Sequence, residues 1–249
     1  MGHTTGRRLA MPSAMQPRLR RLGVLAAARG VSAYAVGGCV RDWLLGRRHQ
    51  TDLDITVEGH GIELARAIAS ALGGTVQAHE PFGTATVTAA SPAQRGTAAR
   101  IDVATARKET YARPGAYPTV SAGTLRDDLF RRDFTINAMA VALNPPRFGE
   151  LIDPFGGAED LRRGLLRVLH ARSFLDDPSR ALRGVRFLRR FGLRWEPDTE
   201  RLLRHAMADG ALGSLNAGRL RKELERMAAE PDPGACLRTV AHLLEPAAG

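Results

Sequence analysis

The sequence predicts an α+β protein in which a mixed sheet with flanking helices is followed by a smaller all-α domain. Strand-length apolar runs alternate with helical segments through the first two thirds of the chain, and their short connections favour an α+β sheet over a doubly wound one. Beyond about residue 165 the hydrophobic period becomes helical. At 249 residues and 44% hydrophobic content, the chain can bury a substantial core. We therefore expect a basic, partly disordered arm with a first helix over residues 1–30, the sheet domain over 31–163 and the all-α domain over 164–249.

The expected elements follow from apolar periodicity and from glycine and proline breakers. In the sheet domain they are, in order, helix 17–29, strand 34–36, helix 40–45, strand 52–57, helix 62–72 and strands 75–78, 84–88, 100–104 and 138–143. Residues 108–123 are rich in turn formers and are expected to form a loop. Helical periodicity then runs through residues 182–191, 202–206, 216–224 and 234–244.

The charge of the chain favours nucleic acid as a partner. The formal net charge is +10, and the cations are almost all arginine, with lysine only at positions 108 and 222. A GC-rich genome accounts for arginine in place of lysine, but it does not account for the net excess of positive charge. Cys39 and Cys236 fit no disulfide or metal spacing, which suits the reducing cytoplasm. No stretch reaches the roughly 18 apolar residues of a membrane span, so no membrane partner is expected.

The first candidate site is a pair of carboxylates on one strand. Residues two apart on a strand share a face, so Asp52 and Asp54 stand side by side while Leu53 points into the core. Two like charges on one face repel each other unless a cation lies between them, and Mg²⁺ takes carboxylate oxygens. Two such ions clamp the attacking and leaving oxygens of a phosphoryl displacement. The preceding Gly37-Gly38 turn lets a triphosphate approach with no Cβ in the way.

Three further residues complete this candidate site. Asp102 lies in a later strand and is flanked by Ile101 and Val103, which face the other way. We interpret it as the third carboxylate, which holds the metal that lowers the pKa of an attacking hydroxyl. Arg131 and Arg132 follow a helical turn and would neutralise a triphosphate opposite the metals.

These residues belong to an ordered series of motifs between residues 33 and 224. After the glycine turn and the paired aspartates come RRDFTINA from Arg131, LIDPFGGAEDL from Leu151, DDPSR from Asp176 and NAGRLRKEL from Asn216. The series resembles the catalytic signature of the polymerase-β-like nucleotidyltransferases. More narrowly, it is similar to the class II tRNA nucleotidyltransferases and the bacterial poly(A) polymerases. The resemblance implies a nucleotidyltransferase head domain followed by an all-α neck domain.

The resemblance also implies an activity and a set of site residues. The expected activity is template-independent addition of CMP and AMP, from CTP and ATP, to the 3′ end of tRNA, with a two-metal Mg²⁺ site at Asp52, Asp54 and Asp102. In the family an aspartate and the arginine three residues later select the base, and these correspond to Asp177 and Arg180. The nucleotide-binding residues implied are Gly37, Gly38, Arg41, Arg131, Arg132, Asp133, Asn137, Asp177, Arg180 and Arg183. The RNA-binding residues implied are Arg186, Arg189 and Arg219.

Two departures from the family pattern leave alternatives open. Gly218 stands where the last motif usually has a glutamate that supports the base pocket together with the following arginine. Related enzymes usually continue with further helical domains that grip the tRNA, so we expect that the arginine-rich helices alone hold the RNA, that a partner supplies the rest, or that this is a shortened or specialised member of the family. The alternatives are therefore an A-adding or CC-adding specialist, a poly(A) polymerase and, more distantly, an inactive RNA-binding protein. The Glu-x-Tyr and Pro-x-Val elements at 109–111 and 118–120 are similar to branches that contain A-adding enzymes.

Overall fold

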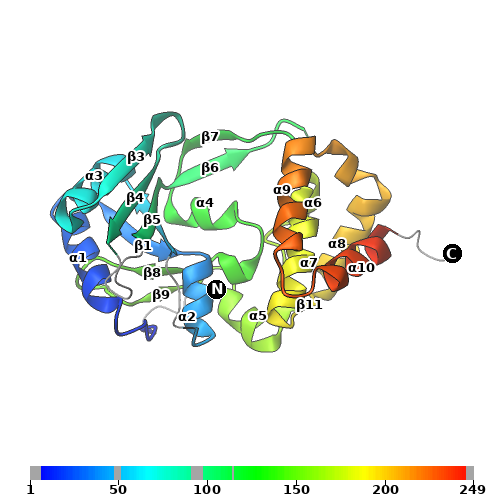
Figure 1. The fold of residues 1–249 in the computed structure, drawn as a ribbon, viewed down its shortest axis with the longest axis horizontal. Helices are drawn as coiled ribbons and strands as arrows, with labels where there is room; N and C mark the ends of the chain where they lie inside the picture. The colour runs from blue at the N-terminus through cyan, green and yellow to red at the C-terminus, as the bar shows by residue number, and fades with distance from the viewer. Residues whose placement is uncertain (1–6, 48–51, 91–97, 114, 245–249) are drawn as a thin grey trace. The chain divides into compact units, whose positions relative to one another are not determined.

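The computed structural model of the chain describes residues 7–47, 52–90, 98–113 and 115–244 (Figure 1). The chain divides into two compact units. The sheet unit comprises Met1–Lys108, Val120–Arg132 and Ile136–Ala158, and the helical unit comprises Glu109–Thr119, Asp133–Thr135 and Glu159–Gly249. This division differs from the predicted one in two respects. The first helix groups with the sheet, and two short segments from the middle of the chain group with the C-terminal helices.

The sheet unit is built on a mixed sheet. Within the described residues this sheet has seven strands in the order β3-β4-β5-β2-β1-β8-β9. The strands are β1 Ser32–Val36, β2 Asp52–Glu58, β3 Thr75–His79, β4 Thr84–Ala90, β5 Ala98–Thr105, β8 Ala140–Ala142 and β9 Leu151–Ile152. β2 and β5 run parallel, whereas the other neighbours in this sheet run antiparallel. The mixed sheet expected from the sequence is therefore present.

Two helices pack on one face of this sheet. Alternation along β2 buries Leu53, Ile55 and Val57 in the same core cluster as apolar side chains of α1 (Gln16–Ala27) and α3 (Gly61–Leu72). Figure 1 shows both helices on the same side of the strands. Because successive residues of a strand point to opposite faces, this packing leaves the alternate residues of β2 on the other face.

The opposite face of the sheet carries a shorter helix. Helix α4 (Leu125–Phe130) lies there, since the Thr56 hydroxyl of β2 donates to a carboxylate oxygen of Asp128 at 3.0 Å. Helix α2 (Gly38–Leu44) follows β1 directly. Short 3₁₀ turns occupy η1 (Glu80–Phe82) and η2 (Thr135–Asn137), and a separate two-stranded sheet pairs β6 (Arg107–Thr110) with β7 (Thr119–Ala122).

The N-terminal segment is anchored to the sheet unit from residue 7 onward. The Leu9 N–H donates to the carbonyl of Gly149 at 2.8 Å, and the Leu151 N–H donates to the carbonyl of Arg7 at 2.9 Å. Leu22 of α1 is fully buried in the core of this unit. Backbone pairing beside β9 therefore anchors Arg7 and Leu9 within the predicted arm. Residues 1–6 lie outside the described residues, and the partial disorder of the arm stays a prediction.

The helical unit is mainly α-helical, as predicted for the C-terminal domain. Its elements are α5 Gly157–Arg163, β10 Leu165–Leu166, α6 Ser173–Asp176, α7 Ser179–Phe191, β11 Arg194–Trp195, α8 Pro197–Ala208, η3 Ala211–Ser214, α9 Ala217–Ala228 and α10 Pro233–Leu244. Leu182, Val185, Met227 and Cys236 form a buried core between its helices. The parallel pairing of β10 with β11 was not expected from the sequence. Across the described ranges, every helix is too short or too polar to cross a membrane.

Candidate active site

Three carboxylates share one face of the central strands in the sheet unit. The register of the parallel strands pairs Asp54 of β2 with Asp102 of β5, and Asp52 with Arg100. Asp52 and Asp54 are exposed while Leu53 between them is buried, so the alternation predicted from the sequence is observed. Because residues in register on neighbouring strands point to the same face, Asp102 joins the two aspartates of β2.

Asp102 is held by two neighbours on this face. The Thr86 hydroxyl donates to its Oδ1 at 2.6 Å, and the Arg100 Nε lies 3.0 Å from Oδ1 and 2.9 Å from Oδ2. Thr86 lies on β4, which flanks β5 on the side away from β2. Among the residues that the structure describes, no group of three or more acidic, histidine or cysteine side chains is arranged to hold a metal ion.

The electrostatics of Asp54 nevertheless fit a cation. Although Asp54 is exposed at the surface, the protein atoms around its carboxyl group partly desolvate it, and this raises its pKa above the ordinary value; the guanidinium of Arg132 opposes this shift, and the carboxylates of Asp102 and Asp52 add to it. A hard divalent cation relieves repulsion of this kind by taking carboxylate oxygens as ligands. The donor set of three carboxylates on one face therefore has the chemistry that Mg²⁺ or a similar ion requires.

The turn after β1 requires glycine at its first position. Gly37 has φ +75°, and a Cβ there would lie 2.6 Å from Nη1 of Arg132. At Gly38 the nearest atom to an added Cβ is Nη2 of Arg41 at 3.5 Å, an ordinary contact, and its φ is not in the left-handed region. Of the two glycines predicted to admit a nucleotide, only Gly37 is required as glycine, because its φ is positive and Arg132 leaves no room for a Cβ.

Asp128 positions both predicted phosphate-binding arginines, and sequence reasoning gave it no role. Its carboxylate is fully buried and accepts from Arg131 at 2.7 and 3.0 Å and from Arg132 at 3.0 Å. Burial acts to raise the pKa of Asp128, but the guanidiniums of Arg132 and Arg131 outweigh it and hold that pKa below its ordinary value. The i, i+3 and i, i+4 spacing to the arginines was the available signal.

Arg41 and Asn137 meet beside the glycine turn. Arg41 Nη1 donates to the amide oxygen of Asn137 at 2.6 Å, and its Nε donates to Asp42 at 3.0 Å. Both predicted nucleotide-binding side chains are buried, so they join α2 to η2 in this structure. Burial raises the pKa of the nearby Cys39 thiol to about 12, so this side chain packs as a small buried group and is a poor nucleophile near neutral pH.

In the helical unit, two predicted nucleotide-binding residues form an ion pair. Arg183 Nη2 lies 2.8 Å from Oδ2 of Asp133, whose carboxylate is almost fully buried. Asp133 also accepts the backbone N–H of Phe134 at 2.8 Å. The charge of Asp133 raises the pKa of Arg183, so this guanidinium stays charged. The pair fixes the segment that directly follows Arg132 in the sequence.

The predicted base-selecting residues are already engaged in this structure. Asp177 lies 2.5 Å from Nη2 of Arg219, and its Oδ1 accepts the hydroxyl of Ser179 at 2.5 Å at the start of α7. Arg180 is buried, and its Nη1 donates to the hydroxyl of Ser173 at 2.5 Å. Arg219, which was predicted to contact RNA, thus neutralises the carboxylate predicted to read the base.

Tyr111 and Tyr117 of the helical unit lie beside these base-selecting residues. Burial and the neighbouring carboxylate of Glu109 raise the pKa of Tyr111 to about 12, while Arg180 opposes the shift. Tyr111 therefore lies within electrostatic reach of Arg180 and remains a neutral hydrogen-bonding group. Arg219 lies over the ring of Tyr117 at 5.9 Å. The sequence analysis identified the segment that contains both tyrosines as a loop; it noted Tyr111 as part of the Glu-x-Tyr element but gave it no role, and it did not single out Tyr117.

Two arginines of α7 that were predicted to bind RNA have different surroundings. Arg186 is buried, with Nε 3.0 Å from Glu230 and Nη1 3.4 Å from Glu223. It could reach a phosphate only by leaving both carboxylates, so its placement supports a structural role in place of the predicted RNA contact. Arg189 is exposed, and its guanidinium donates to the Thr239 hydroxyl at 2.7 and 3.2 Å.

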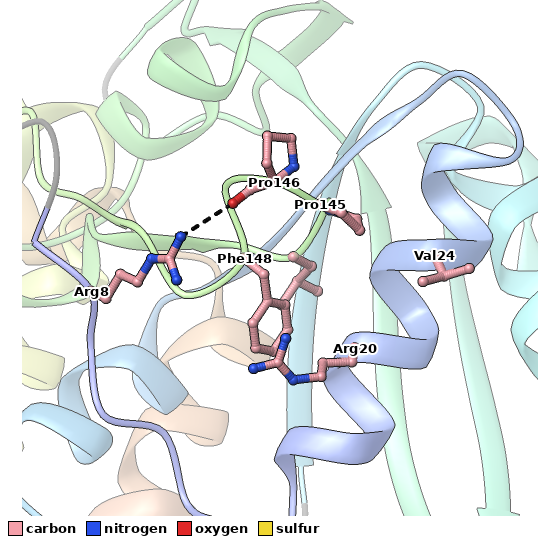
Figure 2. Close-up of a pocket in the computed structure, with 7 residues that line it drawn as sticks. Arg8, Arg20, Val24, Pro145, Pro146 and Phe148 are labelled. Atoms are coloured by element: carbon pink, nitrogen blue, oxygen red, sulfur yellow. Dashed lines mark hydrogen bonds between the residues drawn. The ribbon is translucent and has the colours of Figure 1, made fainter.

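A groove of about 240 Å³ lies in the sheet unit away from these residues (Figure 2). It is lined by two arginines and five apolar residues: Arg8, Arg20, Val24, Leu143, Pro145, Pro146 and Phe148. The Arg20 guanidinium stacks 4.2 Å from the centre of the Phe148 ring. The Leu143 N–H donates to Ala33 at the start of β1, whereas Gly37 follows the end of that strand. The groove is therefore at the opposite end of β1 from the glycine turn.

The mixed sheet carries three carboxylates on one face, beside a glycine turn and paired arginines. These features together indicate that the class of protein is a nucleotidyltransferase with a head domain of this kind. The family described as "Poly A polymerase head domain" matches residues 33–167, which is more than half of the chain. The chain belongs to this family.

Named relatives agree with this assignment. The chain is 44% identical over 217 residues to an A-adding tRNA nucleotidyltransferase of Halalkalibacterium halodurans, which covers 86% of this chain and 49% of that protein. It is 40% identical over 205 residues to a CC-adding tRNA nucleotidyltransferase of Deinococcus radiodurans, with 82% and 52% covered. Among solved structures, the apo form II of a CCA-adding enzyme superposes with a TM-score of 0.85 at 43% identity, covering 93% of this chain and 53% of that one. The chain spans about half the length of these relatives.

Proposed function

We propose that this protein is a template-independent nucleotidyltransferase that adds CMP and AMP, from CTP and ATP, to the 3′ end of tRNA. The observation that carries the proposal is the register that sets Asp102 beside Asp54 on the face that also holds Asp52. Membership of the head-domain family and the tRNA-directed names of the relatives support it. An enzyme that acts on tRNA in this way would work in the cytoplasm.

In the proposed reaction, the 3′-hydroxyl of the tRNA forms a bond to the α-phosphorus of the nucleotide, and pyrophosphate leaves. Asp52, Asp54 and Asp102 would hold two Mg²⁺ ions, which supply Lewis-acid stabilisation of the attacking and leaving oxygens. Asp102 takes the proton of the attacking hydroxyl. Arg131 and Arg132, fixed by their contacts with Asp128, neutralise the triphosphate.

Base selection is assigned to Asp177 and Arg180. A carboxylate accepts a hydrogen bond from an exocyclic amine, and a guanidinium donates to ring nitrogens and carbonyls. Because Asp177 pairs with Arg219 and Arg180 pairs with Ser173, each has to exchange a protein partner for the base edge. Tyr111, close to both electrostatically, is a third candidate for this pocket.

The test uses tRNA transcripts that end at the discriminator base, at C, at CC and at CCA. Each is incubated with Mg²⁺ and with CTP, ATP or both, and the products are sized on a gel. Stepwise growth to CCA followed by arrest is the expected result. An unbounded ladder of A would make the protein a poly(A) polymerase, and failure to extend any transcript would overturn the proposal.

An A-adding specialist is the second candidate. The A-adding relative shares more identity with this chain than the CC-adding relative does, 44% against 40%. The same gel separates the two candidates. A specialist adds one A to the CC-ended transcript and does not extend the transcript that ends at the discriminator base, even with CTP present.

A further inference from the structure

Arg100 is a cation that contacts one of the three carboxylates, Asp102, in this structure. It lies two residues before Asp102 on β5, and its register partner on β2 is Asp52. Its Nε is almost equidistant from the two carboxylate oxygens of Asp102, at 2.9 and 3.0 Å. Positive charge at this face is therefore supplied by a guanidinium that contacts the oxygens a divalent cation would need.

Thr86 holds the same carboxylate from the other side. Its hydroxyl donates to Oδ1 of Asp102 at 2.6 Å from β4, whereas Asp54 lies on β2. Since β4 and β2 flank β5 on opposite sides, each about 4.8 Å away, the hydrogen bond favours an Asp102 position turned from Asp54.

We propose that Arg100 is a positioning residue that, with Thr86, holds Asp102 in a resting position and competes with the divalent cation for its carboxylate. Metal binding then requires Asp102 to exchange Arg100 for the cation and to turn toward Asp54. The inference rests on the proposed function, because it takes Asp52, Asp54 and Asp102 as the metal ligands. It adds an assignment for Arg100 and Thr86, which the catalytic proposal leaves without a role.

The expected size of the competition follows from the exposure of the pair. The side chains of Arg100 and Asp102 are 58% and 36% exposed, and ion pairs this open to water contribute little. Removing the guanidinium should therefore tighten divalent-cation binding by about two- to fivefold. The effect is small enough that a matched control is needed.

The test measures binding of Mn²⁺, a probe for the divalent site, from the loss of its free-ion electron paramagnetic resonance signal on titration with full-length protein. Arg100→Gln should bind Mn²⁺ two- to fivefold more tightly than wild type. Thr86→Val, which keeps the shape and removes the hydrogen bond, should bind about twofold more tightly. Arg100→Lys keeps a cation beside Asp102 and should stay near wild type.

The matched control is Arg66→Gln. Arg66 is similarly exposed and pairs with Glu80 at 2.8 Å, but it lies on α3, across the sheet from the carboxylates. It removes the same charge and should leave Mn²⁺ affinity unchanged. Asp52→Asn distinguishes a failure of the metal assignment from a failure of the inference about Arg100. If wild type shows no binding that Asp52→Asn weakens, the metal assignment and this inference are both overturned. If that binding exists and Arg100→Gln does not tighten it, or Arg66→Gln tightens it equally, the inference alone is overturned.

Discussion

Replacement of Gly37 by alanine is the substitution whose cost the structure defines most closely. Gly37 has φ +75° and ψ −130°, a conformation that L residues rarely adopt, and holding alanine there costs about 1–3 kcal/mol. The new Cβ would also lie 2.6 Å from Nη1 of Arg132. Arg132 would have to move, and its 3.0 Å contact with Asp128 would weaken.

The two effects together set the expected loss. A hydrogen bond between charged groups contributes about 1.5–3 kcal/mol, of which a shifted Arg132 would lose a part. We therefore expect Gly37→Ala to lower the free energy of unfolding by about 2–4 kcal/mol. For a chain of this size, about 2–4 °C is lost per kcal/mol, so the melting temperature should fall by roughly 5–15 °C.

The assay is thermal unfolding followed by circular dichroism, with Gly38→Ala as the matched control. Gly38 has space for a Cβ and an ordinary φ, so alanine should leave stability unchanged or raise it by about 0.4–1 kcal/mol. Equal melting temperatures for Gly37→Ala and wild type would refute the reasoning, since neither the backbone conformation nor the approach of Arg132 could then matter. An equal fall for Gly38→Ala would show that the turn tolerates no side chain at all.

Three further predictions concern residues that the site depends on. Asp128→Asn should lower the free energy of unfolding by about 3 kcal/mol near neutral pH because it leaves two arginines without their buried partner. The folded-state pKa of Asp128 lies below its unfolded value of about 3.9. Its contribution to the free energy of unfolding is therefore present above the unfolded pKa and is lost as the pH falls through the folded pKa. Urea unfolding between about pH 3 and pH 6 should show that the Asp128→Asn variant loses less stability on acidification than wild type does. Arg186→Gln should lower the free energy of unfolding by about 3 kcal/mol because it takes the guanidinium away from two buried carboxylates. Arg189→Gln should leave the melting temperature unchanged, but it should reduce the slope of log K for tRNA binding against log salt concentration by about one. Arg180→Ala should change the ATP-to-CTP ratio of kcat/KM more than it lowers kcat, and an unchanged ratio would assign base selection to other residues.

The face and identity of the paired carboxylates were predictable because they depend on local geometry. Alternation within one strand decides that Asp52 and Asp54 lie together, and the structure has this pattern. The proximity of Asp54 to Asp102 depends on the pairing of β2 with β5, about fifty residues apart in the sequence, and residue pattern alone does not set that register. The contact of Thr86 with Asp102 depends likewise on the register of β4 with β5. Arg100 lies two residues before Asp102 on the same strand, so their shared face follows from local alternation, although the sequence analysis gave Arg100 no role.

Two pairs of similar residues show where sequence reasoning stops. Asp127 caps α4 through Thr124, whereas the adjacent Asp128 is buried under Thr56 and holds two arginines. The packing of α4 on the sheet gives the two adjacent aspartates different roles, which their sequence context does not predict. Arg186 and Arg189 lie three residues apart on α7, yet only Arg186 meets Glu223 and Glu230, which come from α9 and the segment after it. RNA contact was predicted for both on charge alone and stays a prediction, and the acidic partners of Arg186 favour a structural role for that residue.

The most direct test of the central claim is AMP incorporation into CC-ended tRNA by variants of the three carboxylates. Asp52→Asn, Asp54→Asn and Asp102→Asn would each be compared with wild type and with Arg66→Gln, after circular dichroism has shown that every variant is folded. The account predicts a loss of at least about 1,000-fold in turnover for each aspartate variant, equivalent to about 4 kcal/mol of lost transition-state stabilisation. Arg66→Gln should keep the wild-type rate. Turnover within about tenfold of wild type in a folded Asp52→Asn or Asp54→Asn variant would contradict the assignment of this sheet face as the catalytic site.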